Sequence, residues 1–248
     1  MKPLRTVLAT ALVLFAGLAL GSTGFGRADT VALRLAVGLR YMAHGWIAEA
    51  REHLEQAVRL SPALAEGHVL LGLSYHAEGE LERAVGHYRM AQAADPSLSG
   101  LQVLVGDIRM SQGRLAEAEA EYRSALAAEP DLGWAYYGVG RVLQARGEPG
   151  ALEMYEAAVE RAPDLVDARF RLALLLRDTG DLEAALEHLL HATQVNGYVP
   201  EIRLQLAMIY ESLGRAAEAE HEYRTVLELD PGRLEAREGL CRLREEFC

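Results

Sequence analysis

Lysine and aromatic residues are scarce in this 248-residue chain: Lys2 is its one lysine, and aromatic residues make up 6%. The other basic residues are arginines, and the formal net charge is −11. Removing residues 1–28 takes away three basic residues and no acidic one, which lowers the net charge to −14. A surface this acidic, without a run of basic residues, repels a phosphate backbone. Nucleic-acid binding is therefore not expected.

Cysteine is also scarce, since the chain has only Cys241 and Cys248, both near its carboxyl end. If one helix held both residues, their backbones would lie about 10 Å apart, beyond disulfide reach. This geometry favours a buried, unpaired Cys241 and a free terminal thiol at Cys248. A regulatory or intermolecular disulfide through Cys248 is the alternative.

Motifs of catalysis and metal binding are missing. His221-Glu222 is not followed by the second histidine that a zinc-binding helix requires, and Gly138-Val139-Gly140 has no strand before it. His188 and His191 are three residues apart, but two ligands without a cysteine or carboxylate cage do not make a metal site. The other histidines are expected at the surface. We expect no cofactor, no metal and no enzymatic activity; an enzyme without recognisable motifs is the opposing hypothesis.

The amino terminus has the pattern of a targeting segment: two basic residues, an apolar run over residues 7–20, and small residues after it. The run is shorter than the roughly 20 residues that span a bilayer comfortably. A cleaved signal peptide within residues 1–28 is therefore expected, and an uncleaved anchor in the inner membrane is the alternative. Either reading predicts export to the periplasm or another extracytoplasmic space.

A repeat of about 34 residues organises the rest of the chain. Prolines recur at residues 62, 96, 130, 163 and 231. Small residues recur in the first half of each unit: Gly38, Gly72, Gly106, Gly140, Ala173 and Ala207. Turn glycines follow seven residues later: Gly45, Gly79, Gly113, Gly147, Gly180 and Gly214. Alanines come next: Ala50, Ala84, Ala118, Ala151, Ala185 and Ala219. Bulky residues lie four further on: Leu54, Tyr88, Tyr122, Tyr155, Leu189 and Tyr223.

Each position has a physical reason. Glycine adopts the left-handed conformation that ends a helix, so every unit is predicted to be two helices joined by a tight turn. Small residues allow those helices to approach closely, and Tyr or Leu fills the space between units. First helices are expected near residues 31–44, 65–78, 99–112, 133–146, 166–179 and 200–213. Second helices are expected near residues 47–60, 81–94, 115–128, 149–161, 182–195 and 216–229.

This pattern resembles the tetratricopeptide repeat family over residues 31–231. The resemblance implies an all-α, right-handed superhelical solenoid of about six repeats. The repeats would span residues 31–64, 65–98, 99–132, 133–165, 166–199 and 200–233. Residues 234–248 would form a polar capping helix that hides the last apolar face. The family's aromatic residue near the start of the first helix is mostly replaced, here by Arg34, His68, Gln102, Tyr136, Arg169 and Arg203.

In that family the first helices line a groove that holds a peptide or helix of another protein. In the first three units the corresponding positions are apolar. Packing between adjacent first helices is the favoured account of several first-helix residues, notably Leu39, Leu73 and Leu174. In the fourth and fifth units aromatic residues stand beside arginine, the usual composition of a binding hot spot. The candidate partner-binding residues are Trp134, Tyr137, Arg141, Phe170, Arg171 and Arg177. We therefore expect a non-catalytic scaffold or assembly factor of the cell envelope; homo-oligomerisation through the groove is the alternative.

Overall fold

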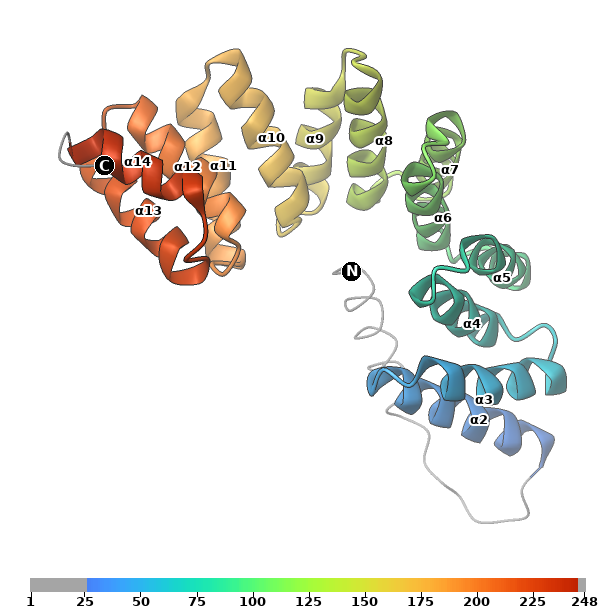
Figure 1. Cartoon of the computed structure of the whole chain (residues 1–248). Helices are drawn as coiled ribbons and strands as arrows, with labels where there is room; N and C mark the ends of the chain where they lie inside the picture. The colour runs from blue at the N-terminus through green and yellow to red at the C-terminus, as the bar shows by residue number, and fades with distance from the viewer. Residues whose placement is uncertain (1–25, 245–248) are drawn as a thin grey trace. The chain divides into compact units, whose positions relative to one another are not determined.

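The computed structural model describes residues 26–244, which form thirteen helices and no strand. The chain divides into two compact units, Met1–Arg114 and Leu115–Cys248. The first unit contains α2 (Arg27–Ala43), α3 (Ile47–Leu60), α4 (Ala65–Ala77), α5 (Leu81–Ala94) and α6 (Gly100–Ser111). Within it, α2 packs on α3, α3 on α4, α4 on α5 and α5 on α6 (Figure 1).

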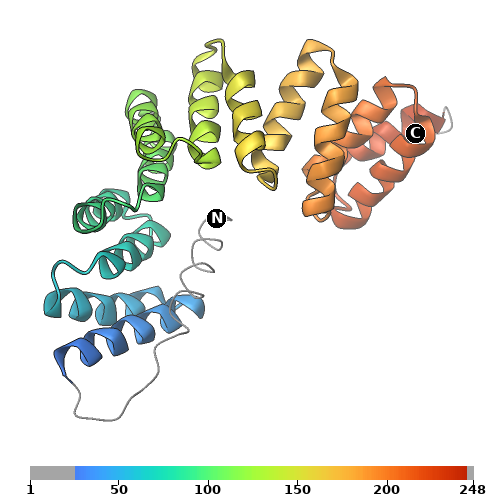
Figure 2. The ribbon, with the colours of Figure 1, turned by 180° about the vertical axis from the view of Figure 1, so that it is seen from behind.

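The second unit contains α7 (Leu115–Ala128), α8 (Gly133–Arg146), α9 (Ala151–Arg161), α10 (Val166–Thr179), α11 (Leu182–Val195), α12 (Pro200–Ser212), α13 (Ala216–Leu229) and α14 (Leu234–Arg244). Each of these helices packs against the next one along the chain, which Figure 2 shows from behind. The all-helical fold of helix pairs in series is thus confirmed. Five of the six predicted second helices begin and end at the expected residues.

Two helix starts differ from the prediction by two residues or more, and the other boundaries of the twelve repeat helices agree to within one residue. α2 begins at Arg27 rather than near residue 31, because the Asp29 carboxylate accepts a hydrogen bond from the Gly26 backbone N–H at 2.9 Å and caps the helix start. α9 begins at Ala151 rather than residue 149, because Gly150 has φ +97° and cannot lie in a right-handed helix. The one-residue-short turn of the fourth repeat is therefore built from two left-handed glycines, Gly147 and Gly150.

The turn between the helices of each pair depends on glycine. All six predicted turn glycines have φ between +67° and +90°, as the sequence indicated. In this conformation the backbone N–H of Gly180 bonds to the Arg177 carbonyl at 3.0 Å, so α10 ends without unpaired carbonyl groups at that point. A side chain with a Cβ would strain this turn.

The bulky residues of the second helices pack onto glycines of the first helices. Tyr155 on α9 is fully buried against Gly140 on α8, where an added Cβ would lie 2.7 Å from its ring. Its hydroxyl donates a hydrogen bond to Gln144 at 2.8 Å, so the phenol is buried without losing its polar partner. Tyr122 on α7 packs in the same way on Gly138 of the following helix. The tyrosine therefore fills space both within a repeat and between repeats.

The alanines and glycines assigned to close packing lie inside the structure. Five of the six alanines have no exposed surface, and the sixth, Ala151, is 8% exposed. The first-helix glycines Gly38, Gly72, Gly106 and Gly140 are buried as well. These positions leave no room for a larger side chain unless neighbours move.

The polar residues that replace the family's aromatic residue bind the preceding turn. Arg169 Nε donates to the Pro163 carbonyl at 2.6 Å, and Arg203 Nε donates to the Gly197 carbonyl at 2.7 Å. His68 Nε2 lies 3.0 Å from the Pro62 carbonyl oxygen and must also donate, because a carbonyl has no hydrogen to offer. These side chains therefore tie the start of a first helix to the turn before it.

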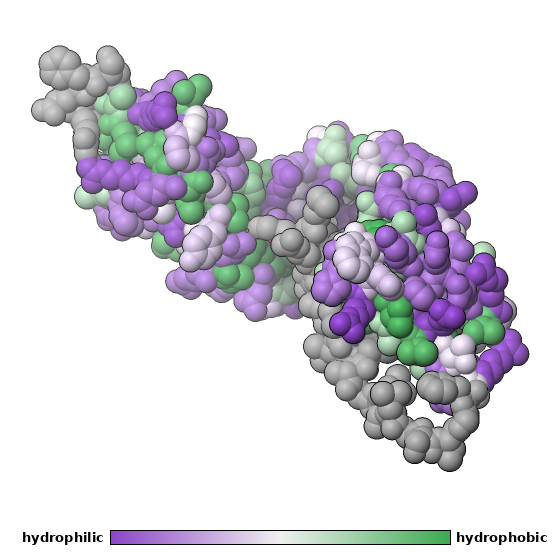
Figure 3. Space-filling model, turned by 60° about the horizontal axis from the view of Figure 1, so that its bottom comes forward, coloured by the Kyte–Doolittle hydropathy of each residue, from purple (hydrophilic) through white to green (hydrophobic). Residues whose placement is uncertain are grey.

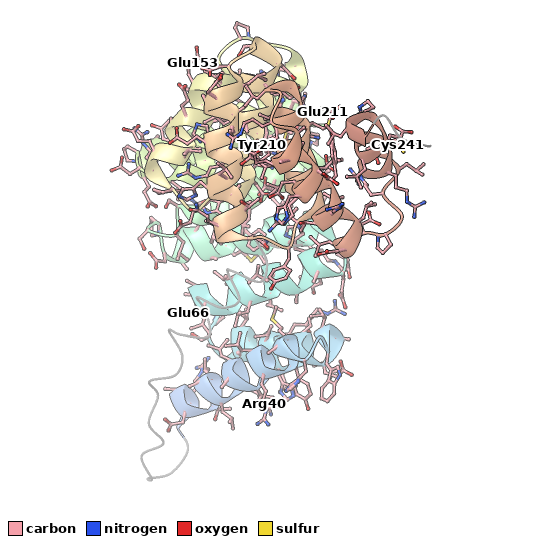
Figure 4. The ribbon with its side chains drawn as sticks, turned by 90° about the vertical axis from the view of Figure 1, so that its left-hand side faces the viewer. Arg40, Glu66, Glu153, Tyr210, Glu211 and Cys241 are labelled. Atoms are coloured by element: carbon pink, nitrogen blue, oxygen red, sulfur yellow. The ribbon has the colours of Figure 1, made fainter. Side chains whose placement is uncertain are left out.

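The last helix, α14, packs on α13 and α12, as a cap requires. Arg242 on α14 bonds to both carboxylate oxygens of Glu211 on α12, at 2.8 and 2.9 Å. Figure 4 labels Glu211 and also Cys241, which lies on α14. The expectation of an unpaired Cys241 is wrong: Cys241 is half-buried and disulfide-bonded, and the described helix stops short of Cys248. The geometric argument applied only if one helix carried both cysteines.

Residues 1–25 of the predicted targeting segment, including the apolar run over residues 7–20, lie outside the described residues, and residues 26–28 form the cap and start of α2. Among residues 26–244, every helix is too short or too polar to cross a membrane.

Candidate partner-binding patch

Three of the candidate residues form one stripe along α8. Trp134, Tyr137 and Arg141 follow each other at intervals of three and four residues, which places them on the same helix face. The Trp134 and Tyr137 rings meet edge to face with centroids 6.3 Å apart, and the Arg141 guanidinium lies 5.5 Å from the Tyr137 ring centroid. Trp134 keeps 37% of its surface exposed. The stripe therefore presents an aromatic platform with a cation at one end.

Tyr137 contacts both of the other residues of this stripe. Its ring also contacts Tyr155 of α9, with centroids 5.9 Å apart. Burial raises the pKa of Tyr137 above its ordinary value, with Asp167 adding to the rise and Arg141 and Arg171 opposing it. Burial also raises the pKa of Tyr155 to about 12. Both phenols therefore stay neutral at physiological pH and act through hydrogen bonds and ring surface.

Arg171 on α10 reaches the same tyrosine. Its positive charge acts to lower the pKa of Tyr137 and of Tyr155, opposing the rise caused by burial, so its guanidinium lies close to both tyrosines. The side chain is exposed, so its N–H groups face solvent. Two guanidiniums from neighbouring first helices thus act on one tyrosine. We call Trp134, Tyr137, Arg141 and Arg171 the aromatic–arginine patch.

The other two candidates, Phe170 and Arg177, lie on α10 and contact α12. Phe170 is half-buried and packs at the edge of the core that includes Leu204 and Leu206 of α12. Arg177 is two turns further along α10, forms an ion pair with Asp178 at 2.7 Å and hydrogen-bonds to Gln205. Phe170 and Arg177 therefore connect α10 to α12, and both are half-buried.

Residues of α12 were missed by the sequence reasoning. Gln205 accepts a hydrogen bond from Arg177, and Met208 is 38% exposed on the same helix. Both could have been found from the repeat, because counting 34 residues from Arg171 and Leu174 reaches Gln205 and Met208. The sixth repeat has no aromatic residue next to an arginine at these positions, so it lacks the composition of a binding hot spot.

The apolar first-helix residues of the first unit are core rather than binding surface. Leu39 is 6% exposed, and Leu73 is fully buried. Val69 and Met110 are half-buried. Packing between helices accounts for these residues, so the exposed candidate surface belongs to the second unit.

Polar side chains dominate the face that Figure 3 turns forward, with hydrophobic residues confined to smaller areas between them. Within residues 26–244, no three His, Cys, Asp or Glu side chains are placed to hold a metal ion. Three histidines of the second helices are not simple surface residues as expected, whereas His221 is exposed. His53, His87 and His188 are half-buried and contact the first helix of their own repeat.

Comparison with known families identifies the repeat. Models of the tetratricopeptide repeat match residues 35–99, 100–132 and 144–228. No relative was found among curated proteins.

Solved structures share the fold at low sequence identity. Pseudomonas aeruginosa pilF superposes with a TM-score of 0.75 at 22% identity, over 88% of this chain and all of that one. PilW, a widely conserved type IV pilus biogenesis factor, gives a TM-score of 0.68 at 19% identity, over 86% and 99% of the two chains. YrrB, a repeat protein with an unusual peptide-binding site, gives 0.55 at 22% identity, over 75% and 96%. These likenesses show the fold alone.

Proposed function

Because the chain belongs to the tetratricopeptide repeat family, we propose that it is a non-catalytic binding protein of the cell envelope that holds a segment of another protein against the aromatic–arginine patch. The observation that supports this most directly is that Arg141 lies over the Tyr137 ring and that the charge of Arg171 also acts on Tyr137, with Trp134 exposed beside it. Buried or half-buried aromatic residues next to arginine are the usual centre of a protein interface.

The chemistry of the patch suits a partner with a carboxylate and an apolar or aromatic side chain. A guanidinium binds a carboxylate with two parallel hydrogen bonds while its flat face rests on an aromatic ring. Tyr137 already supports Arg141 in this way, at 5.5 Å from ring centroid to guanidinium. Exposed Trp134 on α8 and Met208 on α12 offer apolar surface. A short acidic peptide containing an aromatic residue therefore fits best.

The envelope location is inferred from the amino-terminal segment, whose basic start and apolar run have the pattern of an export signal. Among the proteins of similar fold, PilW takes part in type IV pilus biogenesis, an envelope process. The segment acts either as a cleaved signal or as a membrane tether, and the patch lies far from it along the chain.

Capture from an envelope extract, with the chain from Gly26 onward as bait, identifies the partner. The bait begins at Gly26 because this residue caps α2. Calorimetry with the captured partner then compares the parent chain with the double variant Arg141→Ala/Arg171→Ala. If the two arginines are hot spots, binding weakens by about 2 kcal/mol or more, with little change in melting temperature.

The double variant Arg123→Ala/Arg224→Ala is the matched control. It removes the same charge from exposed side chains of second helices, which pair with Glu119 and Glu220 on their own helices. Equal weakening by both double variants would show a general charge effect and would refute the patch. Light scattering on the bait tests the alternative function, because a stable oligomer that Arg141→Ala/Arg171→Ala dissolves would make the patch a self-association surface.

A further inference from the structure

A polar contact recurs between the two helices of a repeat. In four repeats, a residue near the start of the first helix touches the side chain nineteen positions later on the second helix. The pairs are Arg34–His53, His68–His87, Arg169–His188 and Arg203–Glu222. The first-helix member is the residue that replaces the family's aromatic, so these contacts hold the pair together where an aromatic ring would otherwise pack.

The arginine–histidine pairs of the first and fifth repeats depend on protonation, because a guanidinium cannot donate to a ring nitrogen that has a hydrogen. Arg169 NH1 lies 3.3 Å from His188 Nδ1, while Arg169 Nε donates to the Pro163 carbonyl at 2.6 Å. A guanidinium only donates, so His188 Nδ1 must accept and cannot have a hydrogen. Protonation of His188 at Nδ1 removes this acceptor and places two positive charges in contact. The contact between α10 and α11 therefore exists only with neutral His188.

The surroundings of His188 favour its neutral form. Burial is the largest cause that lowers the pKa of His188 below 6.5, and repulsion from Arg169 and from His191 adds to it, while Glu187 opposes it. Because the folded chain resists proton uptake more than the unfolded chain, folding stability from this group is fully present above pH 6.5 and declines as the pH falls below it.

The neighbouring helix does not offset this charge. On α12, which packs on the other side of α11, Arg203 is paired with Glu222 at 2.7 Å, and Glu201 is paired with Arg233. The pair Arg203–Glu222 occupies the same place in the sixth repeat as Arg169–His188 in the fifth. The Arg203–Glu222 contact contains no histidine, so it does not depend on the protonation of an imidazole.

We propose that Arg169 and His188 form a pH-sensitive latch: proton uptake by His188 in mild acid opens the pairing of α10 with α11, while α12 and α13 remain paired. The opening is a property of the fold and does not depend on a partner. Its consequence for binding rests on the proposed function, because α10 also holds Arg171 of the patch.

Amide hydrogen exchange of the full-length chain tests the latch. Spectra at about pH 7.5 and about pH 5.5, corrected for the intrinsic exchange rate, are compared for each helix. Protection of α10 and α11 should fall by at least about threefold, with a ceiling of about tenfold per pH unit for one proton. Protection of α12 and α13 should stay constant. Unchanged protection of α10 and α11, or an equal loss in all helices, would overturn the proposal.

Two variants assign the effect to the contact. His188→Gln keeps an acceptor for Arg169 but does not titrate, so the acid response of α10 and α11 should disappear. Glu222→His transfers the histidine to the sixth repeat, where α12 and α13 should acquire the response. If Glu222→His does not fold, His188→Gln alone decides, because a full acid response in that variant contradicts the latch. The patch and the latch can fail separately. If the patch is wrong, Arg141→Ala/Arg171→Ala binds the partner as the parent chain does. If the latch is wrong, the hydrogen exchange of α10 and α11 does not respond to acid.

Discussion

Gly133→Ala tests the close approach of α8 and α9. Gly133 is the first residue of α8, and a Cβ built there would lie 2.7 Å from Ala162 Cβ, 3.0 Å from the Ala158 carbonyl oxygen and 3.2 Å from the Ala162 amide nitrogen. Two of these three atoms belong to the backbone of α9 or its cap and cannot rotate away. The helix itself must therefore shift to admit one methyl group.

The expected cost follows from two opposing effects. Alanine is favoured over glycine in a helix by up to about 1 kcal/mol, and overpacking of this kind costs about 1–3 kcal/mol. The net result is a loss of about 1–2 kcal/mol in the free energy of unfolding, or about 2–4 °C in melting temperature per kcal/mol for a chain of this size. Urea denaturation followed by helical circular dichroism measures it.

Gly86→Ala is the matched control. Gly86 is exposed on α5, and a Cβ there meets no atom within 4 Å. The same substitution should therefore stabilise the chain by about 0.5–1 kcal/mol. If Gly133→Ala is as stable as the parent chain, or shifts in the same direction as Gly86→Ala, the reasoning about close helix contact at α8 is refuted.

Three further predictions concern packing, pH and location. Ala118→Leu should lower stability by about 1–3 kcal/mol, because Ala118 has no exposed surface; an unchanged melting temperature would show that the site can expand. Hydrogen bonds from Arg242 are the largest cause that lowers the pKa of Glu211 below 4.5, so stability from this pair is present above that pH and lost below it. Arg242→Ala should flatten the stability profile in that acid range, and a profile identical to that of the parent chain would contradict this. Alkaline phosphatase fused to the carboxyl end should be active in cells if the chain is exported, and an inactive fusion with an active cytoplasmic reporter would end that claim.

Much of the fold was predictable because each repeat uses the same local chemistry. Glycine at the turn ends a first helix wherever it appears, and Gly180 and Gly214 adopt the same left-handed backbone although their repeats differ elsewhere. Both ends of α11 were predicted correctly, because Gly180 precedes the helix and the buried Ala185 marks its inner face. Such signals need no knowledge of distant contacts.

The candidate site was predictable in part. Trp134, Tyr137 and Arg141 share one helix face by spacing alone, and the structure brings Arg171 to the same ring. The direction of Phe170 was not readable, because adjacent residues on α10 point about 100° apart and only the position of α12 decides which of them is buried. Helical spacing identifies a stripe but not its neighbour.

The sequence by itself determined the all-α architecture, the helix pairs, the turns and the small residues between helices, since period and local conformation suffice for these. Only the tertiary structure decided which apolar residues are core, as with Leu39 and Leu73, and which partner each polar replacement acquires. Arg169 binds His188 and Arg203 binds Glu222 across helices nineteen residues apart. A side chain's burial and protonation depend on atoms brought close by folding, and a one-dimensional pattern does not contain those distances.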